Sequence, residues 1–367
     1  MRHRFHSMCP YFAMFPESFA ESWIEELTQP GDLVLDPFSG RGTAPFQALL
    51  MGRAAVGGDI NPVAYVLTRA KLRSPSLRQL LARIDELEEK SRVAVRQRES
   101  IDGDQGENRD FFELAFAPRT LVQLCYLRKE LQWSSDDLDA MVAAVTVGCL
   151  HGEVNATANY LSNQMPRTIS TKPNYSVKFW RERGLIPPDR DVFEVIRNRA
   201  KYRYESNRPL RRGQAWLCDM RELPRKVGSK RAQLLITSPP YLDTTSFEED
   251  QWLRGWFLGG AAMPTRGVYS RDDRHYTRDK YWSMIADLWR VAGQLVVPGG
   301  SVVIRIAGRG MSEDELCRGL LGTSVCSQRN VKLVSSGVSE IVRRQTDAFR
   351  PGSLGLRTEV DCQFKMY

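Results

Sequence analysis

The feature that most constrains the fold is a short apolar run that ends in an acid and leads straight into a glycine-rich turn. Residues 33–35 are Leu-Val-Leu, Asp36 follows them, and residues 37–43 read Pro-Phe-Ser-Gly-Arg-Gly-Thr. A short, continuous apolar run is typical of a buried parallel strand. Gly40 and Gly42 let the backbone turn tightly and approach a ligand without a Cβ in the way. The sequence therefore predicts a strand, a ligand-binding turn and a helix after it.

A second strand and a second acid follow that turn. Residues 54–57 are Ala-Ala-Val-Gly, and Asp59 ends the run. At the end of a second strand, a carboxylate can accept hydrogen bonds from both hydroxyls of a ribose. The turn lacks the G-x-G-x-x-G spacing and the lysine of a phosphate-binding loop, so a nucleoside without a phosphate chain, such as S-adenosylmethionine, fits it better. A tight turn in a purely structural sheet is the alternative, which the joint presence of these acids and glycines disfavours.

The second informative segment follows another apolar run. Residues 234–236 are Leu-Leu-Ile, and residues 237–241 read Thr-Ser-Pro-Pro-Tyr. Two consecutive prolines fix the backbone and remove two N–H donors, which leaves the neighbouring carbonyls rigidly aimed. The hydroxyl of Ser238 and the carbonyl of Pro239 can each accept one hydrogen of an exocyclic amine, and Tyr241 offers a flat face to a base. An extended loop or a polyproline ligand is the alternative, and the preceding strand disfavours it.

The rest of the chain predicts an α/β fold with an insertion. We expect one α/β domain built from both ends of the chain, with a Rossmann-like sheet, helices on both faces and a largely helical insertion. The predicted division is a cofactor-binding half at 1–75, the insertion at 76–212, to which we assign target recognition and DNA contact, and a catalytic half at 213–367. Apolar spacing predicts helices at 17–29, 77–98, 118–150 (two helices) and 281–291, and strands at 301–306, 331–334 and 340–342.

The charge of the chain is compatible with a nucleic-acid partner. Lys and Arg total 52 against 44 Asp and Glu, a formal net charge of +8, which also suits an ordinary basic enzyme. Basic residues are dense near position 200, with Tyr202 and Tyr204 between them, as on a surface that binds phosphates. A solvated helix face is the alternative. The basic residues that we assign to DNA contact are Arg197, Arg199, Lys201, Arg203, Arg208 and Arg211.

The sequence disfavours a metal centre and a membrane location. Seven Cys without a C-x-x-C pair, and only four His, give no zinc-binding pattern, so we expect no metal. No apolar run approaches the roughly 18–20 residues that a membrane-spanning helix needs. The segment before Pro16 lacks the apolar stretch of a signal peptide. We therefore expect a cytoplasmic, nucleoid-associated protein.

The two motifs together resemble a known family. D-P-F-x-G-x-G-T and T-S-P-P-Y are similar to motifs I and IV of the amino-group DNA methyltransferases, which methylate N4 of cytosine or N6 of adenine with S-adenosylmethionine. The resemblance covers about residues 10–70 and 215–310. It implies a class I methyltransferase sheet, S-adenosylmethionine as the cofactor and double-stranded DNA as the partner. A restriction endonuclease that acts separately is a further partner that this resemblance implies.

The resemblance also implies which residues bind the cofactor. Residues 58–62 resemble motif II, and residues 217–223 resemble the segment whose acid contacts the adenine of the cofactor. Residues 11–16 resemble motif X, which closes over the methionine end. The cofactor-binding residues implied are Phe15, Asp36, Pro37, Phe38, Ser39, Gly40, Gly42, Thr43, Asp59, Ile60, Asp219 and Met220.

Within that family the residue before Pro-Pro bears on the base. S-P-P-Y favours N4 of cytosine, whereas D-P-P-Y is commoner for N6 of adenine, which stays the alternative. Ser238 and the carbonyl of Pro239 would accept hydrogen bonds from the amine of a flipped-out base, Pro240 would keep the loop rigid, and Tyr241 would stack on the base. Trp252 is assigned to the wall of the base pocket, with a buried aromatic helix face as the alternative.

Two other functions stay open at this point. An RNA or protein amine methyltransferase would use a similar nucleoside turn and a similar Pro-Pro-Tyr loop. A catalytically silent DNA-binding subunit would keep the fold without the reaction. Ser238 disfavours the first alternative, and the intact motif residues Asp36, Asp59 and Asp219 disfavour the second.

Overall fold

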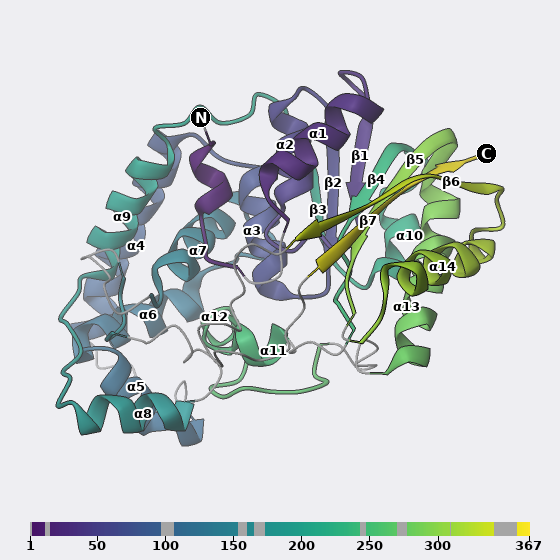
Figure 1. Cartoon of the computed structure of the whole chain (residues 1–367). Coiled ribbons are helices and arrows are strands. Elements are labelled where there is room, and N and C mark those ends of the chain that lie inside the picture. Colours follow the sequence, from purple (N-terminus) through teal and green to yellow (C-terminus); the bar gives the residue numbers. More distant parts are fainter. Residues whose placement is uncertain are drawn as a thin grey trace. The chain divides into compact units, whose positions relative to one another are not determined.

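The computed structural model describes residues 2–11, 15–96, 106–152, 160–164, 173–242, 247–269, 277–308, 310–340 and 358–367. The chain forms two compact units (Figure 1). The sheet unit consists of Tyr11–Thr68, Pro209–Thr245 and Tyr269–Tyr367, and the helical unit of Met1–Pro10, Arg69–Arg208 and Ser246–Val268. The helical unit therefore takes in residues 1–10 and 246–268 as well as most of the expected insertion.

The sheet unit is built on seven strands in the order β3-β2-β1-β4-β5-β7-β6. Strands β1 to β5 are parallel to one another, whereas β7 is antiparallel to both β5 and β6. The chain order reverses between β1 and β4, which is where open α/β sheets bind ligands beyond the carboxyl ends of their strands. The strand bounds are β1 Leu33–Asp36, β2 Ala54–Asp59, β3 Gln214–Leu217, β4 Ala232–Thr237, β5 Val296–Ile306, β6 Val331–Glu340 and β7 Thr358–Met366.

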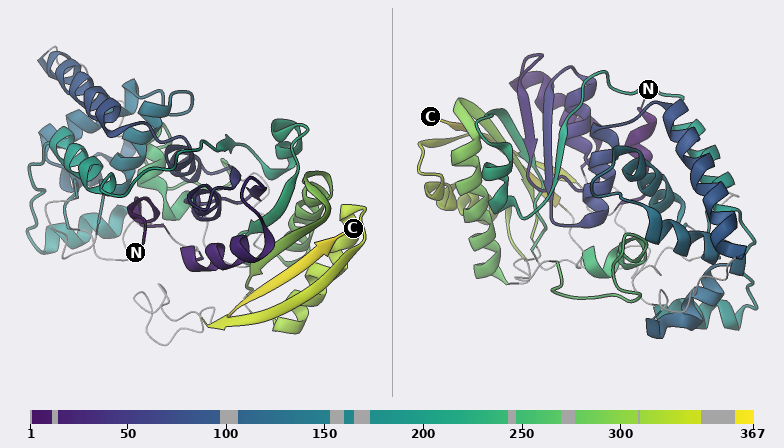
Figure 2. Two further views of the ribbon diagram at one scale, coloured as in Figure 1. Left: turned by 90° about the horizontal axis from the view of Figure 1, so that it is seen from above. Right: turned by 180° about the vertical axis from the view of Figure 1, so that it is seen from behind.

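Helices cover both faces of this sheet. Seen from above, α1 and α2 (purple) lie on one side of it and α13 and α14 (green) on the other (Figure 2). The predicted α/β, Rossmann-like fold with helices on both faces is therefore confirmed. The helices associated with the sheet are α1 Glu17–Leu27, α2 Thr43–Leu50, α3 Pro62–Leu72, α10 Leu223–Val227, α13 Arg278–Leu295 and α14 Glu313–Thr323.

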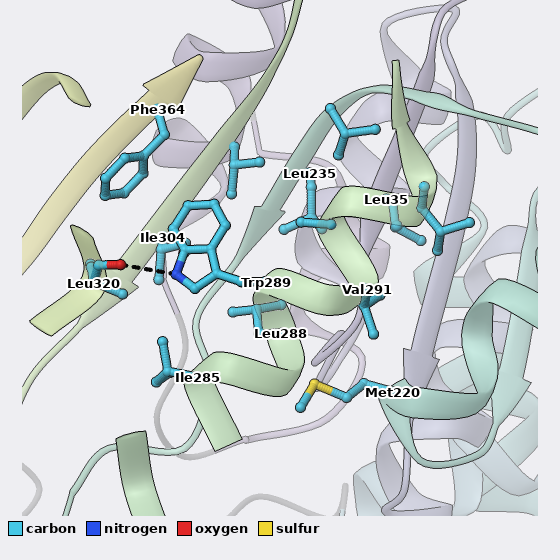
Figure 3. Packing of buried hydrophobic residues seen from close by; sticks show 14 of the residues in the cluster. Leu35, Met220, Leu235, Ile285, Leu288, Trp289, Val291, Ile304, Leu320 and Phe364 are labelled. Carbon is cyan, nitrogen blue, oxygen red and sulfur yellow. Dashed lines mark hydrogen bonds between the residues drawn. The ribbon is translucent and has the colours of Figure 1, made fainter. Parts of the chain in front are cut away.

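The core under α13 is aromatic and aliphatic. Trp289 is fully buried, its ring lies 5.0 Å from the ring of Phe364 between centroids, and its indole N–H donates to the carbonyl of Leu320 at 3.0 Å (Figure 3). Leu35 of β1 and Leu235 of β4 belong to the same cluster. Burial of such side chains contributes about 1.5–3 kcal/mol each, so this core fixes the two strands whose ends carry the predicted motifs.

The helical unit packs around α7 (Asp137–Cys149). Ala140 to Cys149 are all buried, as expected for a helix whose Ala, Met and Val side chains are apolar all round. Helices α4 and α9 lie beside α7 and beside each other. The other helices of this unit are α4 Leu77–Arg96, α5 Arg109–Ala115, α6 Pro118–Glu130, α8 Pro173–Glu182, α9 Val192–Arg203, α11 Phe247–Asp250 and α12 Trp252–Phe257.

The last strands differ from the expectation. Instead of two short strands at 331–334 and 340–342, β6 is continuous from Val331 to Glu340, and residues 341 and 342 lie outside the described residues. Its polar half, Ser335 to Ser339, is held by pairing with β7, which no local apolar pattern reveals. None of the described helices has the length and apolar character needed to cross a membrane.

Candidate cofactor and catalytic site

The turn after β1 is packed so closely that only glycine fits one of its positions. Gly40 and Gly42 have φ of +50° and +75°, in the left-handed region that glycine favours. A Cβ on Gly42 would lie 2.7 Å from Oγ1 and 3.0 Å from Cα of Thr68 in α3. Gly42 is also the N-cap residue that directly precedes α2, so its position relates the turn, α2 and α3.

Asp59 binds the backbone of this turn. Its Oδ2 accepts the N–H of Gly40 at 2.8 Å, and its Oδ1 accepts the N–H of Asn61 at 2.9 Å. Each carboxylate oxygen has a second lone pair, so both can still accept from a ribose hydroxyl. Burial raises the pKa of Asp59 to about 6, against these two hydrogen bonds that lower it. The predicted turn and the predicted ribose acid therefore form one structure.

Asp36 joins the ends of β1 and β4. Its Oδ1 accepts the hydroxyl hydrogen of Thr237 at 2.7 Å and the N–H of Phe38 at 3.1 Å. Burial raises the pKa of Asp36 to about 7. Its Oδ2 is buried and has no hydrogen-bond partner among the described residues. A buried carboxylate oxygen with unused acceptor capacity fits a cationic ligand, and S-adenosylmethionine carries positive charge on its sulfur and its amine.

The segment before α1 packs onto the same turn. The ring of Tyr11 lies 3.5 Å from the place a Cβ on Gly40 would take, and its hydroxyl accepts a hydrogen from the Asn61 side chain at 3.0 Å. Phe15 is buried with its ring 5.0 Å from that of Phe19 between centroids. The parts of the chain that resemble motifs X, I and II therefore lie in contact.

The other residues assigned to the cofactor hold the turn or the core. The Ser39 N–H donates to the carbonyl of Gly58 at 3.0 Å, and Thr43 accepts from the Arg41 guanidinium at 3.2 Å. Phe38 packs against the core cluster that contains Met220. Pro37 is buried, and Ile60 is partly buried. These contacts show that the residues stabilise the turn and the core. Their contact with a cofactor stays a prediction.

Asp219 has a partner that the sequence did not suggest. Both of its carboxylate oxygens accept from the guanidinium of Arg221, at 2.9 and 2.8 Å, and one also accepts the N–H of that residue. Asp219 is only half-buried, so the pair stays in reach of solvent. Its contact with the adenine of a cofactor stays a prediction, with Arg221 as the group that shares the carboxylate.

The S-P-P-Y loop contains a directed chain of hydrogen bonds. The hydroxyl of Ser238 donates to the hydroxyl oxygen of Tyr241 at 3.2 Å, which donates in turn to Oε1 of Glu359 in β7 at 2.7 Å. Burial raises the pKa of Tyr241 well above its ordinary value, and the charge of Glu359 adds to this effect. Tyr241 therefore stays a hydroxyl that donates to the carboxylate.

Glu359 is held in turn by Arg305 of β5. Their side chains lie 3.2 Å apart, and Asp361 accepts two hydrogen bonds from the same guanidinium at 2.6 and 2.7 Å. The guanidinium carbon lies 3.9 Å from the centre of the Phe19 ring. Although burial acts to lower the pKa of Arg305, these two carboxylates hold it above its ordinary value. The site thus ends in an ion-pair network between β5 and β7.

Comparison with known proteins agrees with the motif at the end of β1. Residues 3–69 match the N6/N4 methyltransferase family, described as DNA methylase. A stretch of 75 residues is 31% identical to the type II methyltransferase M.MjaII of Methanocaldococcus jannaschii, covering 20% of this chain and 14% of that relative. The predicted resemblance is confirmed. S-adenosylmethionine, the cofactor that it implies, is confirmed with it.

Two solved structures share part of the course of this chain. TrmN from Thermus thermophilus gives a TM-score of 0.39 at 12% identity, over all of this chain and 53% of that one. An rRNA methylase from Streptococcus thermophilus gives 0.36 at 7% identity, over 97% and 99% of the two chains. The chain thus spans about half of TrmN and a seventh of M.MjaII.

Trp252 lies inside the helical unit. It is 4% exposed, and its ring lies 5.0 Å from that of Phe111 and 6.2 Å from that of Phe112 between centroids. This is the arrangement that the alternative of a buried aromatic helix face describes. The contact of Trp252 with a base stays a prediction.

The basic residues near position 200 divide into two groups. Arg197 forms ion pairs with Asp85 at 2.8 Å and Glu88 at 2.6 Å. Arg203 is 4% exposed and donates to the carbonyl of Arg4 and the hydroxyl of Ser7, and Arg208 donates to the carbonyl of Ser74. The side chains of Lys201 and Arg211 are exposed, and that of Arg199 is partly buried.

No metal centre is visible where the structure gives positions: the described residues contain no group of three or more His, Cys, Asp or Glu that could hold an ion. Two residues of this hydrogen-bonded network were not expected from the sequence, Glu359 and Arg305. Glu359 lies 118 positions from Tyr241, so no local spacing connects them.

Proposed function

We propose that the protein transfers a methyl group from S-adenosylmethionine to the exocyclic N4 amine of a flipped-out cytosine in double-stranded DNA. The observation that carries the proposal is the hydrogen bond from Thr237 to Asp36. It fixes the S-P-P-Y loop at the end of β4 beside the glycine turn at the end of β1. A loop suited to an amine and a turn suited to a nucleoside are thereby anchored to adjacent strands.

The cofactor would be held by the turn and its two acids. Gly40 and Gly42 let the backbone approach the nucleoside, and Asp59 accepts from the ribose hydroxyls. Asp36 provides a buried carboxylate oxygen for the cationic end. When bound, the cofactor supplies a methyl group on positively charged sulfur. These residues therefore supply binding and orientation.

The amine would be held by the S-P-P-Y loop. Ser238 and the carbonyl of Pro239 accept its two hydrogens, Pro240 limits movement of the loop, and Tyr241 stacks on the base as predicted from the resemblance. Holding an amine and a methyl donor in line supplies up to about 7–11 kcal/mol of the barrier reduction. The loop therefore acts mainly by alignment.

DNA as the substrate is supported by the match to DNA methylases and by the net charge of +8. We assign target recognition to the helical unit, whose exposed Lys201 suits a phosphate contact. Such an enzyme works in the cytoplasm on the nucleoid. A restriction endonuclease that cuts the same sequence is the partner expected of a protective methylase. Adenine N6 is the alternative acceptor, because the same loop can hold either exocyclic amine.

The test is to incubate the purified protein and tritiated S-adenosylmethionine with unmethylated genomic DNA and identify the labelled nucleoside. Label in N4-methylcytosine is the expected result. Label in N6-methyladenine would keep the enzyme and change the base, and label only in an added RNA would overturn the substrate. Cofactor binding without any transfer would favour a silent DNA-binding subunit.

A further inference from the structure

Two hydrogen bonds run in sequence from Ser238 toward Glu359: Ser238 donates to Tyr241, and Tyr241 donates to Glu359. We propose that Glu359 receives, through Tyr241 and Ser238, the proton that the target amine loses during methyl transfer. This inference rests on the proposed function and deepens it. Glu359 acts through other side chains, so it is a positioning and proton-accepting residue and does not itself touch the base.

Methylation of an exocyclic amine releases one proton. The amine nitrogen forms its bond to the methyl carbon as the carbon–sulfur bond breaks, and the electrons of that bond stay on sulfur. The nitrogen would keep a positive charge unless it releases a proton and keeps the electron pair of that N–H bond. In the relay that we propose, this proton passes to Ser238 Oγ, the hydroxyl proton of Ser238 passes to the Tyr241 oxygen, and the hydroxyl proton of Tyr241 passes to Glu359. The nitrogen ends neutral, and Glu359 ends as a neutral acid.

The direction of the hydrogen bonds suits this transfer. Because Ser238 uses its hydrogen on Tyr241, its oxygen presents only lone pairs to an amine. Because Tyr241 in turn donates to a carboxylate at 2.7 Å, the two hydrogen bonds polarise each other and strengthen Ser238 as an acceptor. A buried tyrosine that resists ionisation passes the proton without becoming an anion.

The exposure of the three side chains in the relay gives the proton a place to enter and a place to leave. Ser238 is partly exposed at the loop, whereas Tyr241 is 8% exposed, so the middle of the relay is shielded from water. The side chain of Glu359 is 17% exposed, and this edge lets the accepted proton leave to solvent. Arg305 lies 3.2 Å from Glu359 and stabilises the carboxylate that must be present when the reaction starts.

The same strand offers a matched control. Asp361 lies two residues after Glu359, on the same side of β7, and pairs with the same guanidinium at 2.6 and 2.7 Å. Asp361 also accepts the hydroxyl hydrogen of Ser339 at 3.1 Å. Loss of Asp361 therefore weakens the ion-pair network, whereas loss of Glu359 also ends the relay.

The experiment measures single-turnover methyl transfer at saturating cofactor, in water and in deuterium oxide. We expect Glu359→Gln to lower the rate roughly 10²-fold, at the low end for general acid–base groups. It should leave cofactor affinity within about threefold of the wild type and abolish the wild-type solvent isotope effect. Tyr241→Phe should give the same loss, and the double variant no further loss, because both break one relay. Asp361→Asn should keep the isotope effect.

Two results would overturn the relay. One is a Glu359→Gln variant that transfers methyl groups at the wild-type rate with an unchanged isotope effect. The other is additive losses from Tyr241→Phe and Glu359→Gln. Tyr241→Phe leaves the pair of Glu359 and Arg305 in place, so it tests the relay even where Glu359→Gln destabilises the fold. A wild-type protein without transfer to DNA would instead contradict the proposed function.

Discussion

Thr237 donates its hydroxyl hydrogen to Asp36 at 2.7 Å, from the last residue of β4 to the last residue of β1. Thr237 precedes Ser238, and Asp36 precedes the glycine turn. Both residues are buried, and each is 1% exposed or less. One hydrogen bond in the interior thus links the S-P-P-Y loop and the glycine turn through the residues that precede them.

Replacing Thr237 by valine should destabilise the protein. The variant keeps the shape of the side chain but removes the hydrogen bond to a buried carboxylate, at a cost of about 1.5–3 kcal/mol in the free energy of unfolding. Urea unfolding at about pH 8, where Asp36 is mostly ionised, measures it. Thr237→Ser keeps the hydroxyl and should lose less than half as much. A loss in Thr237→Ser as large as that in Thr237→Val would contradict the prediction, because serine keeps the hydroxyl that donates to Asp36.

Cofactor affinity should fall as the solution becomes acidic. Burial raises the pKa of Asp59 to about 6, so the carboxylate that accepts from ribose hydroxyls is lost as pH falls through that value. If only the ionised form binds, the Kd rises about tenfold for each pH unit below it. Calorimetry between about pH 5 and 8 measures this.

Asp36, with a pKa raised to about 7 by burial, titrates in the same window. Asp59→Asn should bind weakly and lose the steep part of the profile near pH 6, while the shallower change due to Asp36 remains. If the cofactor affinity of Asp59→Asn fell with pH as steeply as that of the wild type, the whole pH dependence would be due to Asp36.

Gly42→Ala should be far more harmful than an alanine at another left-handed glycine. Its Cβ would lie 2.7 Å from Thr68 Oγ1 and 3.0 Å from Thr68 Cα, in addition to backbone strain at φ +75°. Gly52, at φ +81° with no atom within 4 Å, isolates the strain alone. We expect Gly52→Ala to cost about 1–2 kcal/mol and Gly42→Ala clearly more, with weaker cofactor binding only in the latter. Thermal unfolding and calorimetry give both quantities.

Ser238→Ala should separate transfer from binding. The hydroxyl contacts the amine and not the cofactor in our proposal, so the single-turnover rate should fall roughly 10²-fold or more while the cofactor Kd stays unchanged. Ser335→Ala removes another hydroxyl of the sheet unit, one bonded to Gln363 at 2.9 Å, and should transfer normally. Parallel losses of rate and cofactor affinity in Ser238→Ala would contradict the assigned role.

The basic residues near position 200 should show two behaviours. Lys201→Ala and Arg211→Ala remove exposed charges, and removing one phosphate-binding charge should reduce the slope of log K against log salt by about 0.9. Arg203→Ala should leave that slope unchanged and lower the free energy of unfolding by about 2 kcal/mol, because it empties a buried, hydrogen-bonded position. Fluorescence anisotropy over a salt series distinguishes them, and a slope that only Arg203→Ala reduces would reverse the assignment.

The sequence predicted those parts of the site whose residues are neighbours along the chain. Asp36, Gly40 and Gly42 follow one strand directly, and a strand that ends in such a turn has few alternatives. Asp59 follows in the next strand of the same β-α-β unit. The fold class could be predicted for the same reason, since apolar runs and helical spacing are local.

Glu359 and the inward direction of Arg203 could not be predicted in that way. Glu359 reaches Tyr241 only because β7 pairs with β5, a long-range event with no local pattern. Arg203 did carry a signal: it lies on the same helix face as Ile196 and Ala200, both fully buried. We assigned Arg203 to the exposed surface because of the many basic residues around it, and not by its spacing from Ile196 and Ala200.

The order of strands at the end of the sheet has a consequence for how the chain folds. β7 lies between β5 and β6, although it follows both in the sequence. Among the described strands, β6 pairs with β7 and with no other, so it joins the sheet only after β7 has been added. Until then β5 has an open edge, where an exposed strand can pair with another chain. We therefore expect this edge of β5 to stay open until β7 has been synthesised, and the bond from Tyr241 to Glu359 to form only after β7 has paired with β5.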